Sequence, residues 1–390
     1  MQPAVRISGF SAMTRQADMP PSLREIIDSY TRDTPLAQAS TPPAAWYLDR
    51  RIIDLERRTV FARSWQLAGR VDQVRQPAQY LSCELAAGEP VVIVRGNDHV
   101  LRGFFNLCRH HAAAVVTEPE GTAPSLRCPY HGWTYSLEGE LKGTPDFAGV
   151  CDFDRAANGL VPLETAVWGK WIFVRLEHDS HSLEGFVGAD LLSRMRPFGL
   201  EHLCWMERRS YTLDCNWKVF VDNYLDGGYH VPHVHKGLDS VLDYSQYTIE
   251  NGEHVCLQSS PLVSEGAEPR TGAVRTGDRT LYCWIYPNFM INCYGGAMDT
   301  NLVIPLAIDK TQVIFDFYFS DVSQRARVRN LASIEVSEHI QEEDVSICTS
   351  VQRGLRSRAY TAGRLSVRRE AGEHLFHRLL YDDLKAGLAG

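Results

Sequence analysis

The chain has 390 residues, enough for two domains that each bury a core of their own. Its hydrophobic content of 44% and charged content of 23% are ordinary for a soluble protein. The net charge of −8 disfavours a general nucleic-acid or anionic-membrane binder. No apolar run reaches the roughly 18 residues of a membrane-spanning helix, and residues 1–20 lack the apolar core of a secretory signal.

The cysteines are too sparse for a disulfide scaffold, since there are ten in 390 residues. Thiols at this density are typical of a reducing compartment, so we predict a cytoplasmic protein. We expect five of them to be reduced and mostly buried: Cys83, Cys151, Cys204, Cys256 and Cys348.

The first half of the chain predicts an arm followed by a small β domain. Residues 1–45 are rich in Pro, Ala, Ser and Thr, with one helical patch at 22–30. Apolar residues at helical spacing predict a helix over 49–69. Short β-type runs separated by Gly and Pro then follow at 80–85, 90–95, 100–106, 133–137 and 171–175. We therefore predict an antiparallel β domain over 46–178 and a junction near 177–190.

Two short motifs in this domain mix one cysteine with one histidine each. They are Cys108-Arg109-His110 and Cys128-Pro129-Tyr130-His131. A Rieske [2Fe-2S] cluster needs two thiolates on one iron and two imidazoles on the other, which two mixed loops supply. The same residue types could hold zinc, but zinc fingers usually pair Cys with Cys and His with His. The mixed halves favour the iron–sulfur cluster.

A second metal site is indicated by three histidines within six residues, at positions 230, 233 and 235. They follow a helical segment, 216–225, and are preceded by Asp222 and Asp226. Two imidazoles and one carboxylate on one face suit a mononuclear Fe(II) with open positions for oxygen chemistry. On an ideal helix His230 would pair with His233. The Gly227-Gly228 pair and Pro232 break the helix, so spacing leaves His230 with His235 equally open.

The rest of this region, 179–390, predicts a catalytic domain with a curved antiparallel sheet. Residues 245–275 are polar loops, while 280–294, 302–306 and 312–320 are β-prone. The fold class is therefore α+β, with a helix-grip-like second domain. Four aromatic residues could belong to the core or line a pocket that holds a quaternary ammonium by cation–π attraction: Trp284, Tyr286, Phe289 and Tyr294.

A long helix over 327–354 supplies the expected carboxylate. Asp344 shares a stripe with apolar residues, which are Ile340, Ile347, Cys348 and Val351. We expect this stripe to be the buried side of the helix. A carboxylate on an apolar face needs a partner, and a metal supplies one. Asp344 is therefore the predicted third ligand.

The motifs together resemble Rieske non-haem iron oxygenase α subunits, over most of the chain after about residue 45. Within that family the chain is most similar to choline monooxygenase and related quaternary-ammonium oxygenases. The similar segments are NWKVFVDNYLDGGYHVP, YPNFMIN, MDTNLVIPL and EDVSICTSVQRGL. The resemblance implies these cluster ligands: Cys108, His110, Cys128 and His131. It implies these ligands of the mononuclear iron: His230, His235 and Asp344.

Two positions depart from the family pattern. Many members carry an acid three residues before the first iron histidine, where it bridges to the cluster of the next subunit. Here that position is Gly227, and the nearest acid is Asp226, which becomes the candidate electron bridge. Residues 295–297, Gly-Gly-Ala, also lack the bulky residue expected of choline-type enzymes.

The resemblance implies a monooxygenase that hydroxylates a C–H bond next to nitrogen, giving oxidation or N-demethylation. It implies electrons from an NAD(P)H-dependent flavin reductase, with or without a ferredoxin. It also implies a head-to-tail homotrimer in which each cluster serves the neighbour's iron. Two alternatives are an aromatic-ring hydroxylating oxygenase of the same architecture and, in another class, a pure electron carrier with two irons per chain.

Overall fold

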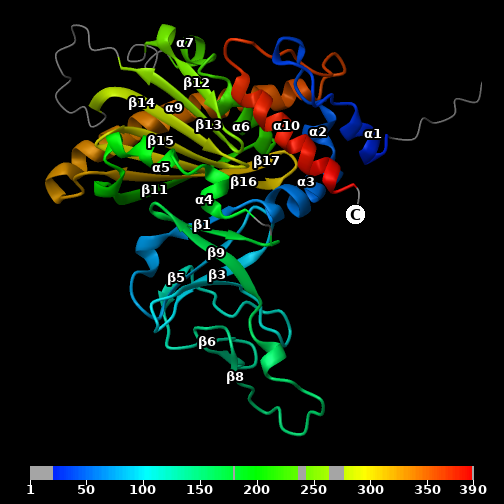
Figure 1. The fold of residues 1–390 in the computed structure, drawn as a ribbon, viewed down its shortest axis with the longest axis vertical. Coiled ribbons are helices and arrows are strands. Elements are labelled where there is room, and N and C mark those ends of the chain that lie inside the picture. The colour runs from blue at the N-terminus through cyan, green and yellow to red at the C-terminus, as the bar shows by residue number, and fades with distance from the viewer. Residues whose placement is uncertain (1–20, 179–180, 236–242, 263–275, 389–390) are drawn as a thin grey trace, which may run out of the picture.

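Two seven-stranded antiparallel sheets organise the molecule, one in each half of Figure 1. The computed structural model describes residues 21–178, 181–235, 243–262 and 276–388. The strands up to residue 175 form the lower body of Figure 1, and those from residue 204 onward form the upper body with most of the helices. Parts of the predicted arm (1–20) and of the predicted loops (263–275) lie outside the described residues.

The large sheet of the lower body has the strand order β1-β10-β9-β4-β3-β2-β5. Its interior strand β3 is buried on both faces, because Val92 and Val94 enter one core and Val91 and Ile93 another. The strands are β1 Gln66–Arg70, β2 Gln79–Glu84, β3 Pro90–Arg95, β4 Leu101–Phe105, β5 Glu120–Thr122, β9 Pro162–Trp168 and β10 Trp171–Arg175.

The predicted helix over 49–69 is shorter than expected. Helix α3, Arg50–Glu56, continues as a π-helical turn over Arg57–Phe61. Residues after this turn form strand β1, which pairs with β10 in antiparallel register. Hydrogen bonds to β10 pair the backbone N–H and C=O groups of these residues. Strand pairing therefore prevails over the helical pattern of their sequence.

A three-stranded sheet lies below the large sheet of the lower body in Figure 1. Its strands are β6 Leu126–Arg127, β7 Thr134–Tyr135 and β8 Leu141–Gly143. The second Cys/His motif is the loop between β6 and β7. The first motif follows β4, and both cysteines enter the same small core.

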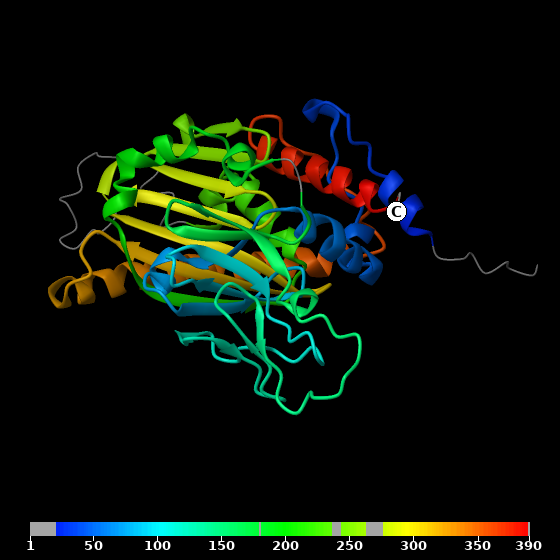
Figure 2. The ribbon, with the colours of Figure 1, turned by 60° about the horizontal axis from the view of Figure 1, so that its bottom comes forward.

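The upper body is a curved sheet with the order β11-β17-β16-β15-β14-β13-β12. Helix α6, Trp217–Leu225, packs on it together with α9, Gln324–Leu355, and α10, Ala371–Ala386. The opposite face packs on the lower body, where Phe289 meets Trp171 and Phe173 (Figures 1 and 2). The strands are β11 Cys204–Leu213, β12 Thr248–Asn251, β13 Val255–Pro261, β14 Thr276–Ile285, β15 Phe289–Gly295, β16 Ala297–Ala307 and β17 Lys310–Phe319.

The N-terminal helices α1, Leu23–Asp28, and α2, Ala45–Leu48, share the upper body's core together with α3. The prediction assigned residues 46–61 to the lower domain, but the structure packs them against α6 and α10. Glu56 explains the placement, because its carboxylate accepts from Trp217 Nε1 at 2.8 Å and from Lys218 Nζ at 2.5 Å. Glu56 and Lys218 are both fully buried, so this ion pair can form only where α3 meets α6.

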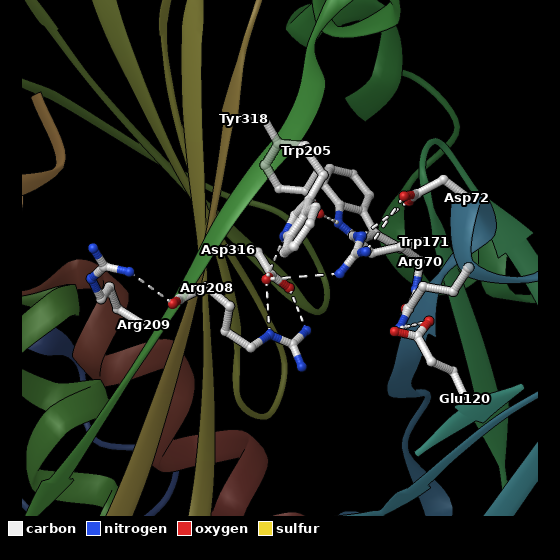
Figure 3. A network of polar contacts seen from close by, with 10 residues as sticks. Arg70, Asp72, Glu120, Trp171, Trp205, Arg208, Arg209, Asp316 and Tyr318 are labelled. Atoms are coloured by element: carbon white, nitrogen blue, oxygen red, sulfur yellow. Dashed lines mark hydrogen bonds and ion pairs between the residues drawn. The ribbon is translucent and has the colours of Figure 1, made fainter. Parts of the chain in front are cut away.

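A polar network joins the two bodies (Figure 3). Asp316 on β17 accepts from Arg208 Nη2 at 2.6 Å and from Trp205 Nε1 at 2.8 Å. Arg70 of β1 reaches the same carboxylate at 3.9 Å and lies 4.1 Å over the Trp205 ring. Because Arg70 and Asp316 are nearly buried, this contact fixes the lower body against the upper sheet.

All ten cysteines are free. Of the five named above, Cys256 and Cys348 are buried and Cys83 is half-buried, whereas Cys151 and Cys204 are exposed. Among the described helices, none is both long and apolar enough to cross a membrane.

Candidate metal centres

The two Cys/His loops have the same backbone path. In each loop the cysteine N–H donates to the carbonyl five residues on, Ala113 or Trp133, at 2.8 and 2.9 Å. The cysteine carbonyl accepts from Ala112 or Gly132, which have φ of +59° and +71°. A positive φ is uncommon for alanine, so the matching hydrogen bonds hold both loops in the same tight turn with one left-handed residue. Two equivalent turns thus present one cysteine and one histidine each.

The side chains in these loops are arranged to receive a metal cluster. Cys108 and Cys128 are 3% and 2% exposed and lie in the same small core. Burial and the neighbouring Cys108 raise the pKa of Cys128, so two adjacent thiolates need a cation there. His110 Nδ1 is buried without a hydrogen-bond partner among the described residues, as expected of a nitrogen reserved for iron. The donor set fits a Rieske cluster.

Neighbouring aromatic residues position the first of these histidines. The His110 ring stacks on Trp133 at 4.7 Å and 3°, and Trp133 is itself 2% exposed. Burial, followed by the nearby His111 and His131, lowers the pKa of His110 and so favours the neutral form that binds metal. Tyr135 Oη accepts the Arg109 N–H at 2.9 Å and lies 3.4 Å from Cys108 Sγ.

The structure brings His230, His235 and Asp344 together, with their ligand atoms within 4.8 Å of one another. Helix α7, Val231–Val234, is a single turn flanked by the two histidines, and their rings lie 4.8 Å apart at 79°. His233 is exposed instead. Asp344 Oδ1 lies 3.1 Å from His235 Nε2 and 3.8 Å from His230 Nε2. This donor set could hold Fe(II) with open positions.

A second ring of polar groups orients these three residues. Asp226 Oδ2 lies 2.6 Å from His230 Nδ1, and Glu343 Oε2 lies 2.7 Å from His235 Nδ1. Asn223 Nδ2 donates to Asp344 Oδ1 at 2.9 Å. A carboxylate on Nδ1 fixes the proton there and leaves Nε2 free for a metal. Glu343 and Asn223 were missed by sequence reasoning, since an acidic run on a helix normally indicates a solvated face.

The charges around His230, His235 and Asp344 also favour a bound cation. Burial by itself lowers the pKa of His235, but the carboxylates of Asp344 and Glu343 outweigh it and raise that pKa overall. A neutral imidazole bound to a divalent ion would satisfy the same carboxylates.

The predicted buried stripe of α9 is partly wrong. Cys348 is buried, but Ile347 is 36% and Val351 44% exposed. The buried positions recur every seven residues through Ile334, Gln341 and Cys348, so Asp344 lies at the edge of the buried face. That edge is where the helix meets α6 and the histidines.

A cavity of about 130 Å³ opens beside the three candidate ligands. Most of its wall is aromatic or amide-bearing and comes from α6, the sheet and α9. Its lining includes Tyr224, Tyr282, Asn292, Tyr294, Asp299, Asn301, Gln341 and Asp344.

Only one of the four predicted pocket rings, Tyr294, lies at this cavity. Phe289 points to the opposite face of its strand, because it is an odd number of residues from Tyr294. Trp284 is fully buried and packs on Phe376 of α10, and Tyr286 donates to Asp383 at 2.6 Å. These three rings belong to the core, which corrects that part of the prediction.

A lower body with two mixed Cys/His loops and an upper body with a two-histidine, one-carboxylate cluster define a Rieske non-haem iron oxygenase α subunit. The sequence matches the Rieske [2Fe-2S] domain over residues 64–154 and the ring hydroxylating alpha subunit (catalytic domain) over residues 200–386. Choline monooxygenase of Arabidopsis thaliana is 39% identical over 374 residues, 93% of this chain and 87% of that protein. The chain therefore belongs to the Rieske non-haem iron monooxygenases that include the choline and carnitine enzymes.

More distant relatives support the same fold and, where the identity is high enough, the same family. The carnitine monooxygenase oxygenase subunit of Escherichia coli K12 is 29% identical over 365 residues, 88% of this chain and 93% of that one. A quaternary ammonium Rieske monooxygenase solved with L-carnitine superposes with a TM-score of 0.76 at 27% identity, covering 89% of this chain and 96% of that one. Naphthalene 1,2-dioxygenase, at 16% identity and a TM-score of 0.74, shares the fold alone. These findings confirm the predicted α+β fold class and an enzyme rather than an electron carrier.

Proposed function

We propose that this enzyme oxidises a choline- or betaine-like quaternary ammonium compound at a C–H bond next to nitrogen. The observation that carries the proposal is the aromatic cavity opening directly beside His230, His235 and Asp344. Aromatic rings attract a quaternary ammonium through their π faces, each contributing roughly 0.5–2 kcal/mol. The choline and carnitine enzymes among its relatives support the same substrate class.

In the proposed roles, His230, His235 and Asp344 would hold Fe(II), and Cys108, His110, Cys128 and His131 would hold the [2Fe-2S] cluster. When bound, the cluster supplies electrons and the iron supplies dioxygen activation. Asp226 and Glu343 keep a proton on each Nδ1, so both Nε2 atoms point to the metal position. Asn223 holds the Asp344 carboxylate, and the rings around the cavity exclude water from the substrate.

We further propose a head-to-tail homotrimer with Asp226 as the electron bridge between chains. The small sheet of β6 to β8, which carries the second Cys/His loop, lies in the lower part of Figure 1 and α7 at its top, an arrangement that does not suit direct transfer within one chain. Asp226 contacts His230 and also lines a second cavity, together with the exposed Ile347 and Val351. An apolar rim around a polar opening suits a protein interface. The proposed electron source is an NAD(P)H-dependent flavin reductase, with or without a ferredoxin, and the proposed location is the cytoplasm.

The test is a substrate screen with a surrogate reductase, scored by NADH-coupled O2 uptake and product formation. We expect trimethylated amines to be turned over and aromatic acids to be inert. Turnover of aromatic acids alone would support the ring-hydroxylating alternative. Metal analysis should give about three irons per chain, two in the cluster and one mononuclear.

Histidine variants test the proposed ligands independently of the substrate. His230→Ala and His235→Ala should each remove the mononuclear iron and leave the visible spectrum of the cluster unchanged. His233→Ala is the matched control, because this third histidine is exposed and should keep the iron. Full iron content in His235→Ala would contradict the assignment.

A further inference from the structure

Gln258 is a buried glutamine in the wall of the cavity beside the candidate iron ligands. It lies on β13, is 1% exposed, and uses both ends of its amide in hydrogen bonds. Its Nε2 donates to the carbonyl oxygen of Tyr224 at 2.9 Å, and its Oε1 accepts from Tyr247 Oη at 3.0 Å. A carbonyl oxygen can only accept, so the amide has one orientation. A single side chain thus joins the sheet to α6 and to a tyrosine of the cavity wall.

The donor half of this amide completes the end of α6. Tyr224 is the last residue but one of the helix, so in a continuing helix its carbonyl would accept from the N–H of Gly228. The helix ends at Leu225 instead, and Gln258 Nε2 supplies the donor that the ended helix lacks. Gln258 therefore stabilises the point from which the chain turns toward His230.

The acceptor half of the amide holds the ring of Tyr247 against the same turn. Gly228 has φ of +68°, and a Cβ placed there would lie 3.1 Å from Cε2 of this ring. Tyr247 therefore packs on backbone two residues before His230, and both Tyr247 and Gly228 line the cavity. Because Oη donates to Gln258, the ring is fixed at its far end as well as along its edge.

Tyr224 supplies a second ring to the cavity and is also held at both ends. Its carbonyl accepts from Gln258, and its Oη donates to Asn292 Oδ1 at 2.8 Å. A quaternary ammonium has no N–H to donate, so aromatic rings hold it only when it lies over their faces. The orientation of the two rings therefore decides how well this cavity binds such a group.

We propose that Gln258 is a positioning residue for the oxidation of quaternary ammonium compounds, an inference that rests on the proposed function. Gln258 acts through Tyr247 and Tyr224, whose rings receive the trimethylammonium group of the substrate. The same amide holds the end of α6, so the rings and the turn before His230 keep one fixed relation to each other. An ammonium group over the Tyr247 ring then lies close to the metal position, which suits oxidation of a C–H bond next to nitrogen.

Calorimetric binding to the iron-reconstituted protein tests the proposal with choline and its uncharged carbon isostere, 3,3-dimethylbutan-1-ol. Tyr247→Leu removes a ring, so it should weaken choline about two- to thirtyfold and leave the isostere within about twofold. Gln258→Met keeps the length and removes both hydrogen bonds, so it should lower the ratio of choline to isostere affinity in the same direction. Added to Tyr247→Leu, it should lower this ratio less than it does alone, because one ring that it positions is gone. Gln246→Met is the matched control, since this neighbouring glutamine is exposed and bonds to Asp243.

The outcomes separate the role of Gln258 from the proposed function. A wild-type ratio of choline to isostere affinity in Gln258→Met, measured at equal iron content and with an unchanged cluster spectrum, would overturn the positioning role. If Gln258→Met does not fold, Tyr247→Phe decides, because it keeps the ring and removes only the hydroxyl that Gln258 holds. This variant should lower the ratio by less than Tyr247→Leu, and a wild-type ratio would overturn the role. Both negative results leave quaternary ammonium oxidation intact, whereas a wild type that neither binds nor oxidises any trimethylammonium compound would refute the proposed function itself.

Discussion

Each imidazole of the proposed iron site is held by a carboxylate from a different direction. Asp226 comes from the end of α6, and Glu343 from α9, one residue before Asp344. Both accept at Nδ1 within 2.7 Å, so neither histidine ring can turn without losing a charge-assisted hydrogen bond. The rings are therefore oriented before any metal arrives.

Glu343→Gln should weaken Fe(II) binding by about 10- to 100-fold, because a neutral amide fixes the Nδ1 proton of His235 less strongly. The measurement is a titration of Fe(II) binding, with the visible absorbance of the cluster as an internal reference. Glu342→Gln is the control, since the neighbouring side chain is 77% exposed and should bind iron like the wild type. The idea fails if both variants lose iron equally.

At this scale the sequence predicted the donor types, while the fold decided which donors meet. The spacing of the three histidines left two pairs open. Helix α7 ends at Val234, and this end places His235 in the buried interior while His233 stays exposed. Asp299, which lines the cavity, was missed because strand alternation cannot say which face of a sheet carries a cavity.

The break between α6 and α7 depends on two glycines with positive φ. Gly227 has φ of +65°, and a Cβ placed there would lie 2.2 Å from the carbonyl oxygen of Arg369. A side chain at this position would clash with that backbone oxygen, so the fold has no room here for the acid that the family pattern places three residues before the first histidine. The same close approach ties the turn before His230 to the segment before α10.

Gly227→Ala should unfold at a lower temperature and retain less mononuclear iron, because it adds both a backbone strain and a steric clash. We expect a loss of about 1–3 kcal/mol or more. Gly354→Ala is the control, because this glycine lies in α9 with nothing near its Cβ position and should be neutral or slightly stabilising. Thermal unfolding and iron content of both variants provide the comparison, and equal behaviour would count against the clash.

The buried pair of Glu56 and Lys218 fixes α3 against the start of α6. Lys218→Met would leave a carboxylate buried without its cation, at a cost of about 3–5 kcal/mol. Removing both charges in Glu56→Leu/Lys218→Met should cost less than the single change, since only the Trp217 N–H then loses its acceptor. Chemical denaturation at equal iron content measures the difference. A double variant that is less stable than Lys218→Met would contradict the expectation.

Most elements were predictable from periodicity, and the exceptions have physical causes. Helices α6 and α9 agree with the sequence pattern within a few residues. Strand β1 was hidden because its residues continue a helical pattern until β10 pairs with them. Helix α10 was missed although Phe376, Leu380 and Leu384 recur at helical spacing and are fully buried.

Across the whole molecule, the two proposed redox centres lie in different bodies, and the cluster loops reach the surface. His131 and Tyr130 are exposed, Tyr130 at 63%. The second cavity beside Asp226 opens on the other body. A second copy of the chain could therefore present its cluster loops to this opening, which is the assembly proposed above.

Mixing two inactive variants tests that assembly. Cys108→Ser should lack the cluster and His235→Ala the mononuclear iron, so each alone should be inactive. Co-folded in equal amounts, they should recover about a quarter of wild-type activity, because half the chains keep the iron and half of their neighbours keep the cluster. No recovery in oligomers shown by mass to contain both variants would mean that electrons stay within one chain.

The chain leaves the upper body near residue 62 and re-enters it beside the same point. Glu177 N–H donates to Ala62 O at 3.1 Å, and α1 to α3 share their core with α10. During translation the ribosome therefore completes the entire lower body before α10, the partner of the first helices, has been made. Helices α1 to α3 therefore lack α10, their partner in the core, through most of synthesis.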